Sequence, residues 1–469
     1  MNDAGAAAGP AGTPGDVAAA FAARLAEVRA AVPRAEVAEV FVTDLNGLAR
    51  GKLVPIEMLA KLGAGRMRLP ISSLALDVFT MDVPETGLAL ERGDPDGVLI
   101  PVPETLAPML WAARPTLQCQ AMLSDEGGAA VSALDPRGIL AGVVRRAEAM
   151  GFAPVMALEL EFYLIDPEHP LPPQNPQAGG RLKRAQVYDM DVIRAFEPVL
   201  GRIAEAARAL GAPTETAICE FGPGQFEINL AHAGSALTAC DHTVALRRAI
   251  RGVARGAGLD ASFMAKPFGD MAGSGLHLHL SLRDADGAPA FAAGAADGGP
   301  GALLRAAVAG VLDSLPDTML VHAPHLNSYR RFAPGSYAPM VAAWGLDNRG
   351  AAVRVPEATG PGARLETRLS GADANPYLVA AAVLSGALAG IEAGLAPPAP
   401  VAAEPGEGEG TPLPLSWAMA EQAFSASPAI APSLGAAFQR VFAAMKRQER
   451  ATLMAQVPDI EYEAYLRVV

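Results

Sequence analysis

The sequence is poor in cysteine, which excludes several classes of site. Among 469 residues it has only Cys119, Cys219 and Cys240, and none of them forms a CxxC pair or another spacing typical of metal sites. So small and odd a number excludes a disulfide scaffold and a structural zinc site built from thiolates. It also favours a reducing compartment, so we expect a cytoplasmic protein.

Long apolar runs and targeting segments are also lacking. No stretch of 18 or more continuously apolar residues occurs, so the sequence predicts no membrane span. The first residues, MNDAGAAAGPAGTPGD, lack the basic and apolar regions of a secretory signal. There is no GxxxxGK[ST] phosphate-binding loop either, so any nucleotide must bind in another way.

Positive charge is in short supply. Asp and Glu number 50 against 37 Lys and Arg, which gives a formal net charge of −13 and argues against a nucleic-acid partner. An acidic surface suits cationic substrates weakly, although most of these charges can equally be explained by solubility. Aromatic residues make up only 5%, yet 51% of the chain is hydrophobic, so a large core can form.

The length and the pattern of elements predict an α+β protein of more than one domain. Residues 1–15 are an Ala/Gly/Pro-rich segment that we expect to be a flexible tail, after which Asp16 is expected to cap a helix. A Gly/Ala-rich stretch at 124–132 is the expected boundary between an N-terminal domain, 16–130, and a larger domain, 131–469. Residues 395–414 are expected to form a surface loop.

Four predicted strands place polar side chains on one face. Side chains alternate between the faces of a strand, and here leucine and other apolar residues alternate with the following polar ones: Glu159 and Glu161; Gln225, Glu227 and Asn229; His277, His279 and Ser281; Arg364, Glu366 and Arg368. A solvated sheet face explains one such strand equally well. Four strands with carboxylates, imidazoles and arginines indicate a shared cavity.

That cavity has the chemistry of a metal site. It would collect Glu159, Glu161, Glu227 and Glu366, together with Glu220. Carboxylates so close remain ionised together only when cations lie between them. Hard oxygen ligands with one imidazole suit Mg²⁺ or Mn²⁺, and His277 is the expected imidazole. The glycine-rich segments before Gln225 and His277 permit a ligand to approach the backbone closely, although turns use glycine in any case.

Seven ordered motifs between residues 36 and 390 resemble the glutamine synthetase family. They are FVTDLNGLARGK, LELEFYLID, EFGPGQFEINL, FMAKPFGDMAGSGLHLHLSL, NSYRRFAPGSYAP, NRGAAVRVP and RLETRLSGADANPYL. The resemblance implies a small β-grasp-like N-terminal domain, 16–130, and a catalytic domain, 131–469, with a curved antiparallel sheet flanked by helices. Within the family, TDLNG, ELEFYL, GPGQFEINL and GADANPYLV most resemble the gamma-glutamylputrescine synthetase branch.

The resemblance implies two metal ions and a bound nucleotide. The ligands of the ion nearest the amino-acid substrate would be Glu161, Glu220 and Glu227. The second ion, which bridges the ATP phosphates, would be held by Glu159, His277 and Glu366. His279 and Ser281 fall where the family holds the nucleotide.

It also implies the remaining substrate contacts. The arginines around the transferred phosphoryl group would be Arg349, Arg354 and Arg364. Those at the glutamate carboxylate and the phosphorylated intermediate would be Arg331 and Arg368. Asp44 matches an aspartate that reaches the amine site from a neighbouring subunit, in a family that forms two stacked rings of six.

The implied reaction is a two-step, ATP-dependent ligation. The glutamate γ-carboxylate attacks the γ-phosphate of ATP, and an amine then attacks the resulting acyl phosphate. The flap glutamate of true glutamine synthetases, which helps to deprotonate ammonium, is replaced here by Tyr337, and an asparagine of the family by Ala272. The loss of the flap acid favours an alkyl amine such as putrescine or another polyamine over ammonia.

Three alternatives remain open from the sequence. In the first, Tyr337 only packs in the flap, and another residue supplies the function of the missing glutamate. In the second, the amine is ammonia, ethanolamine or methylamine. A non-catalytic member is disfavoured because every matched ligand and arginine position is intact. The 395–414 loop contains no tyrosine, so we do not expect the adenylylation known at this loop in part of the family.

Overall fold

The computed structural model describes residues 13–128, 130–169, 171–177, 179–296, 298–406 and 408–469. Most of the predicted tail, residues 1–12, therefore lies outside the described residues. The first helix begins earlier than expected: α1 spans Pro14–Ala31, and its N-cap is Thr13, which corrects the prediction that Asp16 caps it. Asp16 instead completes a capping box, because its carboxylate accepts a 2.7 Å hydrogen bond from Thr13 N.

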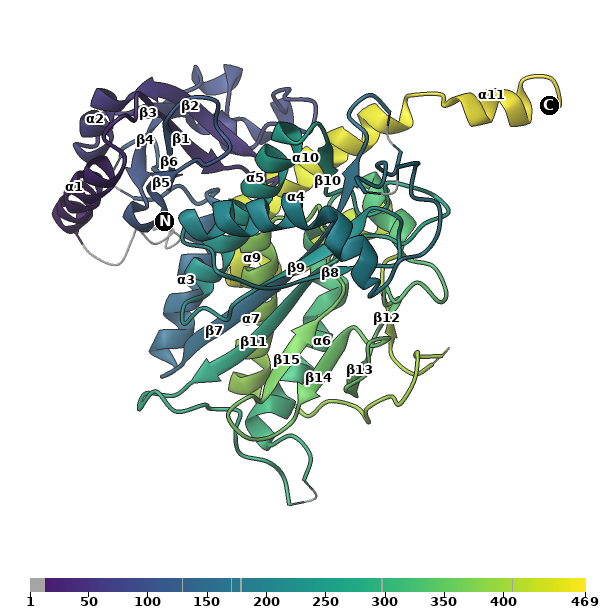
Figure 1. The fold of residues 1–469 in the computed structure, drawn as a ribbon. Coiled ribbons are helices and arrows are strands. Elements are labelled where there is room, and N and C mark those ends of the chain that lie inside the picture. The colour runs from purple at the N-terminus through teal and green to yellow at the C-terminus, as the bar shows by residue number, and fades with distance from the viewer. Residues whose placement is uncertain (1–12, 129, 170, 178, 297, 407) are drawn as a thin grey trace.

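The N-terminal part of the chain forms a six-stranded sheet of order β2-β1-β6-β4-β3, with β5 paired to β6. The strands are β1 Val37–Thr43, β2 Ala49–Pro55, β3 Arg68–Pro70, β4 Asp96–Pro101, β5 Ala107–Pro108 and β6 Thr116–Leu123. β1 pairs antiparallel with β2 and parallel with β6. The short helices here are η1 Ile56–Met58, α2 Leu59–Gly63, η2 Ile71–Leu74, η3 Pro84–Thr86, η4 Leu90–Arg92 and η5 Pro103–Thr105. This sheet lies at one end of the molecule (Figure 1).

A larger, eight-stranded sheet follows, of order β13-β14-β15-β11-β7-β9-β8, with β10 paired to β7. The strands are β7 Ala153–Ile165, β8 Thr214–Cys219, β9 Gln225–Leu230, β10 Asp260–Ser262, β11 Leu276–Arg283, β13 Trp344–Leu346, β14 Val353–Glu357 and β15 Arg364–Thr367. Its pairs are antiparallel, as predicted, except that β13 and β14 are parallel. A separate two-stranded pair joins β12 Val341–Ala342 to β16 Thr411–Pro412.

Helices surround the larger sheet. They are α3 Pro136–Ala149, α4 Met190–Ala209, α5 Ala236–Gly256, α6 Ala302–His322, η6 Leu326–Arg331, α7 Pro376–Ala393, α8 Trp417–Ala426, α9 Ile430–Leu434, α10 Ala436–Met454 and α11 Asp459–Tyr465. α5 packs on β7, and α6 packs on β14, β15 and α7. The sequence pattern did not predict α5, whose N-cap Ser235 makes no side-chain hydrogen bond. The predicted α+β class is confirmed.

Helices α6 and α7 approach closely because glycines line their contact. A Cβ on Gly310 would lie 2.2 Å from the carbonyl oxygen of Gly386, and one on Gly390 would lie 2.1 Å from that of Ala306. Among the residues that the structure describes, α7 is the one helix long and apolar enough to cross a membrane. However, 78% of that apolar window is buried inside the protein, as in a core helix.

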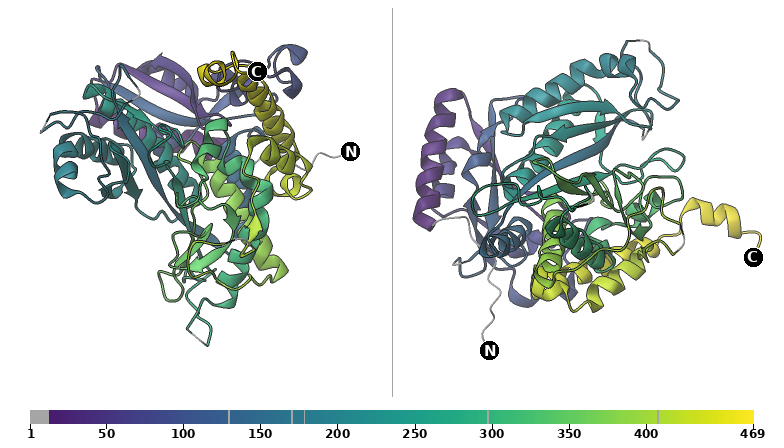
Figure 2. Two further views of the ribbon diagram at one scale, coloured as in Figure 1. Left: turned by 90° about the vertical axis from the view of Figure 1, so that its right-hand side faces the viewer. Right: turned by 90° about the horizontal axis from the view of Figure 1, so that it is seen from below.

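The C-terminal segment leaves the body of the protein. α11 extends outward at the end of α10, and the C-terminus lies at its tip (Figures 1 and 2). Its apolar side chains are exposed, with Ile460 at 65%, Leu466 at 64% and Val468 at 76%. α10, in contrast, is attached to the N-terminal sheet, because the buried Lys446 and Glu449 both bond to Asn46 in the turn after β1.

Candidate active site

Strand register brings the predicted polar residues face to face. His277 on β11 is the cross-strand partner of Glu159 on β7, and Glu159 is also the partner of Asn229 on β9. Glu161 lies opposite Glu227, and His279 lies opposite Glu366. Residues directly opposite in an antiparallel pair have Cβ atoms about 5 Å apart. The convergence expected from the alternation of side chains is therefore present in the structure.

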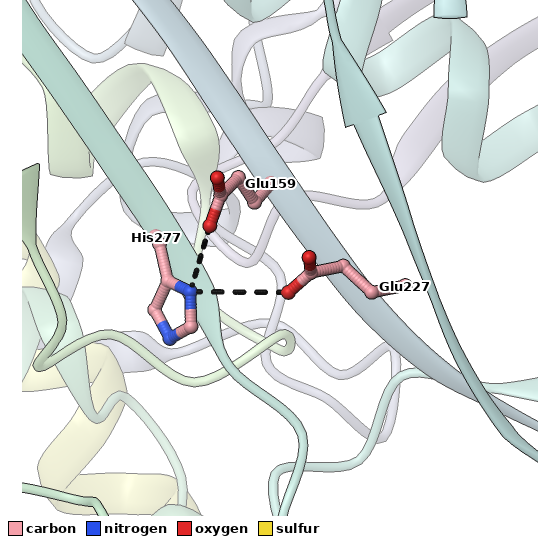
Figure 3. A group of neighbouring side chains, drawn as sticks. All are labelled: Glu159, Glu227 and His277. Atoms are coloured by element: carbon pink, nitrogen blue, oxygen red, sulfur yellow. Dashed lines mark hydrogen bonds and ion pairs between the residues drawn. The ribbon is translucent and has the colours of Figure 1, made fainter. Parts of the chain in front are cut away.

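Three overlapping groups of side chains each hold their ligand atoms within 4.8 Å of one another. The groups are Glu161, Glu220 and Glu227; Glu159, Glu227 and His277; and Glu159, His279 and Glu366. The first is the set expected for one metal ion. In the second group, shown in Figure 3, His277 Nδ1 lies 3.1 Å from Glu159 and 4.0 Å from Glu227.

The set expected for the second metal ion is arranged differently. His279, not His277, shares a group with Glu159 and Glu366, and its Nε2 lies 3.1 Å from Glu159 Oε1. His277 lies instead between the two halves of the cluster, with Nε2 3.8 Å from Glu161. The cause is the register, because β11 places His279 beside Glu366 on β15 and His277 beside Glu159 on β7.

The electrostatics of the cluster fit a divalent cation. Burial and the negative charges of Glu159 and Glu161 raise the pKa of Glu227 well above its usual value. Burial and the charge of Glu161 raise the pKa of Glu220 to about 7. Burial would also raise the pKa of Glu159, but hydrogen bonds with His277 and His279 outweigh it and lower that pKa. Cations among these oxygen and imidazole donors would relieve the repulsion.

Residues around the cluster hold its carboxylates in place. Asn229 Nδ2 donates to Glu159 Oε1 at 3.0 Å, and Gln225 Nε2 donates to Glu161 Oε2 at 3.3 Å. The backbone of Gly275 also donates to Glu161, at 2.7 Å. Such contacts fix the orientation of metal ligands. The sequence placed Gln225 and Asn229 on the face of Glu227, but it gave no sign of their partners.

Two arginines bond to Glu366 of the cluster. Arg354 Nη1 donates to Glu366 Oε2 at 2.7 Å, and Arg368 pairs with the other oxygen of the same carboxylate. Arg354 is also held by Asp347, which sequence reasoning missed, at 3.1 Å. Although burial would raise the pKa of Glu366, Arg368 and the two histidines lower it. Glu366 therefore remains a carboxylate between two guanidinium groups.

The other expected nucleotide and phosphate residues border this region. Arg364 Nε donates to His279 Nδ1 at 3.3 Å, and Ser281 lies two residues beyond His279 on β11. Arg331 is buried and donates to the carbonyl oxygens of Leu369 and Arg368 at 2.8 and 3.1 Å. The Arg349 side chain is exposed, while its carbonyl oxygen accepts a 3.1 Å hydrogen bond from Arg368.

Tyr337 lies on the flap, defined here as residues 334–339, and it has an aromatic partner. Its backbone adopts a left-handed conformation with φ of 56°, and 59% of the residue is exposed. Its ring stacks on Phe221 with the centroids 6.4 Å apart and an interplanar angle of 25°. Phe221 directly follows Glu220 and is 49% exposed. Sequence reasoning missed Phe221; its position beside Glu220 was the available signal.

Asp44 is not brought to the acidic cluster of its own chain. It lies in the turn between β1 and β2, fully buried, and accepts hydrogen bonds from Leu48 N and Arg50 Nε, both at 2.8 Å. Asn375, the N-cap of α7, donates to its carbonyl oxygen. Burial raises the pKa of Asp44 to about 6. Its expected role at a neighbouring subunit's site stays a prediction.

Comparison with known proteins places this arrangement in a family. Residues 133–465 match the family described as glutamine synthetase, catalytic domain. The chain belongs to the glutamine synthetase family. The family resemblance and the ligase class expected from the motifs are thereby confirmed. Enzymes of this family use ATP and divalent metal ions, in agreement with the acidic cluster.

Several relatives in the family act on glutamate and an amine. The chain is 38% identical over 442 residues to gamma-glutamylputrescine synthetase PuuA of Escherichia coli K12, covering 93% of this chain and 92% of that protein. It is 30% identical to glutamate–isopropylamine ligase of Pseudomonas sp., covering 91% and 89%. A solved GmaS–ADP complex has a TM-score of 0.82 at 29% identity, covering 94% of this chain and 99% of that one.

Proposed function

We propose that this enzyme joins the γ-carboxyl group of glutamate to putrescine or another polyamine, with ATP and Mg²⁺ or Mn²⁺. The observation that carries the choice of amine is the stacked pair of Phe221 and Tyr337. Phe221 directly follows Glu220, and Tyr337 stands where true glutamine synthetases have a flap glutamate. The likeness to gamma-glutamylputrescine synthetase PuuA over 93% of the chain supports the same choice. The assigned metal, nucleotide and substrate residues are part of this proposal.

The chain's own residues account for the first step. The γ-carboxylate oxygen of glutamate attacks the γ-phosphorus of ATP, and the bond from that phosphorus to the bridging oxygen of ADP breaks. Arg354 and Arg364 flank the path of the phosphoryl group, and Arg331 and Arg368 orient the glutamate. Divalent ions, when bound by the glutamates and histidines, supply positive charge to the phosphate oxygens.

The second step needs a neutral amine, because only an unprotonated amino group has a lone pair free to attack. That nitrogen attacks the acyl carbon, the carbon–oxygen bond to phosphate breaks, and the amine gives up a proton to a base. The rings of Phe221 and Tyr337 suit the methylenes of an alkyl amine and the cation at its far end.

A second candidate amine is ethanolamine. The chain is 37% identical over 314 residues to gamma-glutamylethanolamide synthetase GlnA4 of Streptomyces coelicolor, covering 66% of each protein. Both amines share an alkyl chain that an aromatic wall accommodates, and they differ in the charge at the far end. Ammonia lacks the methylenes that the two rings would contact.

The proposal extends to organisation and assembly. We propose an N-terminal domain of residues 16–130, a catalytic domain of residues 131–469, a cytoplasmic location and a homo-oligomer of two stacked rings of six. Two features support the oligomer. Asp44 lies apart from the acidic cluster of its own chain, and α11 extends from the body with exposed apolar side chains. Sedimentation of the purified protein tests the assembly.

Changing the flap residue is expected to change the choice of amine. Tyr337→Glu restores an acid at the flap and removes an aromatic wall, so the ratio of kcat/KM for ammonium to that for putrescine should rise by about tenfold or more. Tyr337→Phe is the matched control, because it keeps the ring and should leave this ratio within about twofold. The two rates are measured by phosphate release, and an unchanged ratio in Tyr337→Glu would mean that the flap does not set the choice.

A further inference from the structure

The segment predicted as a surface loop is largely exposed, but hydrogen bonds attach it to the chain that follows the flap. We define the strap as residues 398–406 and 408–413. Trp344 Nε1 donates to Pro398 O, and Val401 N donates to Trp344 O, both at 2.8 Å. At its other end, β16 of the strap pairs with β12, and Leu413 N donates to Met340 O at 3.2 Å. The strap is therefore fixed at both ends to the chain that follows the flap.

The strap also holds the turn that carries Arg349. Asn348 Nδ2 donates to the carbonyl oxygens of Val401 and Ala403, at 3.0 and 2.7 Å. A Cβ on Gly350 would lie only 3.1 Å from Glu404 Cα, so the two backbones touch there. The same turn is joined to the substrate arginines, because Arg349 O accepts a hydrogen bond from Arg368.

One side chain of the strap reaches the flap itself. Glu404 Oε1 accepts a 3.1 Å hydrogen bond from the backbone N–H of Gly335, two residues before Tyr337. On the other side, the Ser336 hydroxyl lies 3.1 Å from Arg331 O and 2.6 Å from Ala333 O. The flap is thus held between Arg331, at the glutamate site, and Glu404, on the strap.

We propose that Glu404 is a positioning residue that holds the flap against the Arg349 turn and so keeps water away from the acyl phosphate until the amine attacks. This proposal rests on the proposed function, because it assumes an acyl phosphate intermediate. If the flap opens, a water oxygen attacks the acyl carbon, the bond to phosphate breaks and a proton is released. Glutamate and phosphate are then formed without amide, although ATP has been consumed.

The test is the number of ADP molecules released for each amide formed. In the wild type the ratio should be close to one. Glu404→Ala removes the acceptor for Gly335 N–H, so we expect a ratio above two and a KM for the amine raised about fivefold, as for the loss of one ordinary hydrogen bond. Glu404→Gln keeps an acceptor oxygen without the charge, and should return both quantities to within about twofold of the wild type.

The controls separate the possible failures. Glu409→Ala removes another carboxylate of the strap, one that bonds to Gly406 N within the strap, and should leave the ratio near one. An unchanged ratio in Glu404→Ala, an equal loss in Glu409→Ala, or a loss in Glu404→Gln as large as in Glu404→Ala would each overturn the proposal. If the wild type prefers an amine other than putrescine, the ratio is measured with that amine. A wrong amine assignment therefore does not affect the test of Glu404.

Discussion

Replacing Glu161 with alanine is expected to lower turnover on the order of a thousandfold, the size of effect seen when charge stabilisation of a reacting group is lost. Glu161 is grouped with Glu220 and Glu227 and is held by Gly275 N and Gln225. Its removal would leave two donors in this group, too few for the cation that we propose there. Phosphate release from ATP with glutamate and the amine measures the loss.

A second readout ties this loss to the metal. Added Mg²⁺ or Mn²⁺ should raise the melting temperature of the wild type, because a ligand that binds only the folded state stabilises it. The shift should be much smaller in Glu161→Ala. Glu205→Ala, on the exposed side of α4, is the control and should behave as the wild type. Turnover in Glu161→Ala within about tenfold of the wild type would contradict the ligand assignment.

Replacing Glu366 with alanine is expected to destabilise the protein as well as inactivate it. Glu366 is fully buried between Arg354 and Arg368, and both guanidinium groups bond to its carboxylate. Removing one partner of a buried ion pair leaves charge uncompensated and costs about 3–5 kcal/mol. Urea unfolding at a fixed pH measures this free energy.

The expected loss of stability in Glu366→Ala affects the interpretation of its activity. Lost turnover in Glu366→Ala would reflect unfolding as well as any lost metal ligand. Glu161, in contrast, is only partly buried, and among the described residues it bonds to no arginine. Glu366→Gln retains one acceptor oxygen and should be intermediate in stability. An unfolding free energy for Glu366→Ala within about 1 kcal/mol of the wild type would show that the two arginines find other partners.

The sequence predicted which residues line the site better than which of them lie next to each other. Alternation of side chains placed Glu159, His277 and Glu366 on polar faces, and this depends only on the period of a strand. Which histidine meets Glu366 depends on the register between β11 and β15, strands that are about 90 residues apart in the chain. Local pattern does not determine such a register. The assignment of His277 to the second ion and of His279 to the nucleotide came from the family resemblance, and it stays a prediction.

The loops were the least predictable part. Phe221 and Glu404 lie outside regular elements, where no periodicity indicates what a side chain meets. Their contacts, with Tyr337 and with Gly335, join segments more than 60 residues apart. Helix α5 was also missed, although Ser235, a residue type that favours the N-cap position, directly precedes it.

The central claim, ligation of glutamate to an alkyl polyamine, is tested most directly by an amine panel on the wild type. Phosphate release is measured with glutamate, ATP and Mg²⁺, and with ammonium, methylamine, ethanolamine, putrescine, spermidine or spermine supplied in turn. The account predicts the highest kcat/KM with putrescine or a longer polyamine, and a γ-glutamyl amide of matching mass as product. The highest activity with ammonium, giving glutamine, would contradict it.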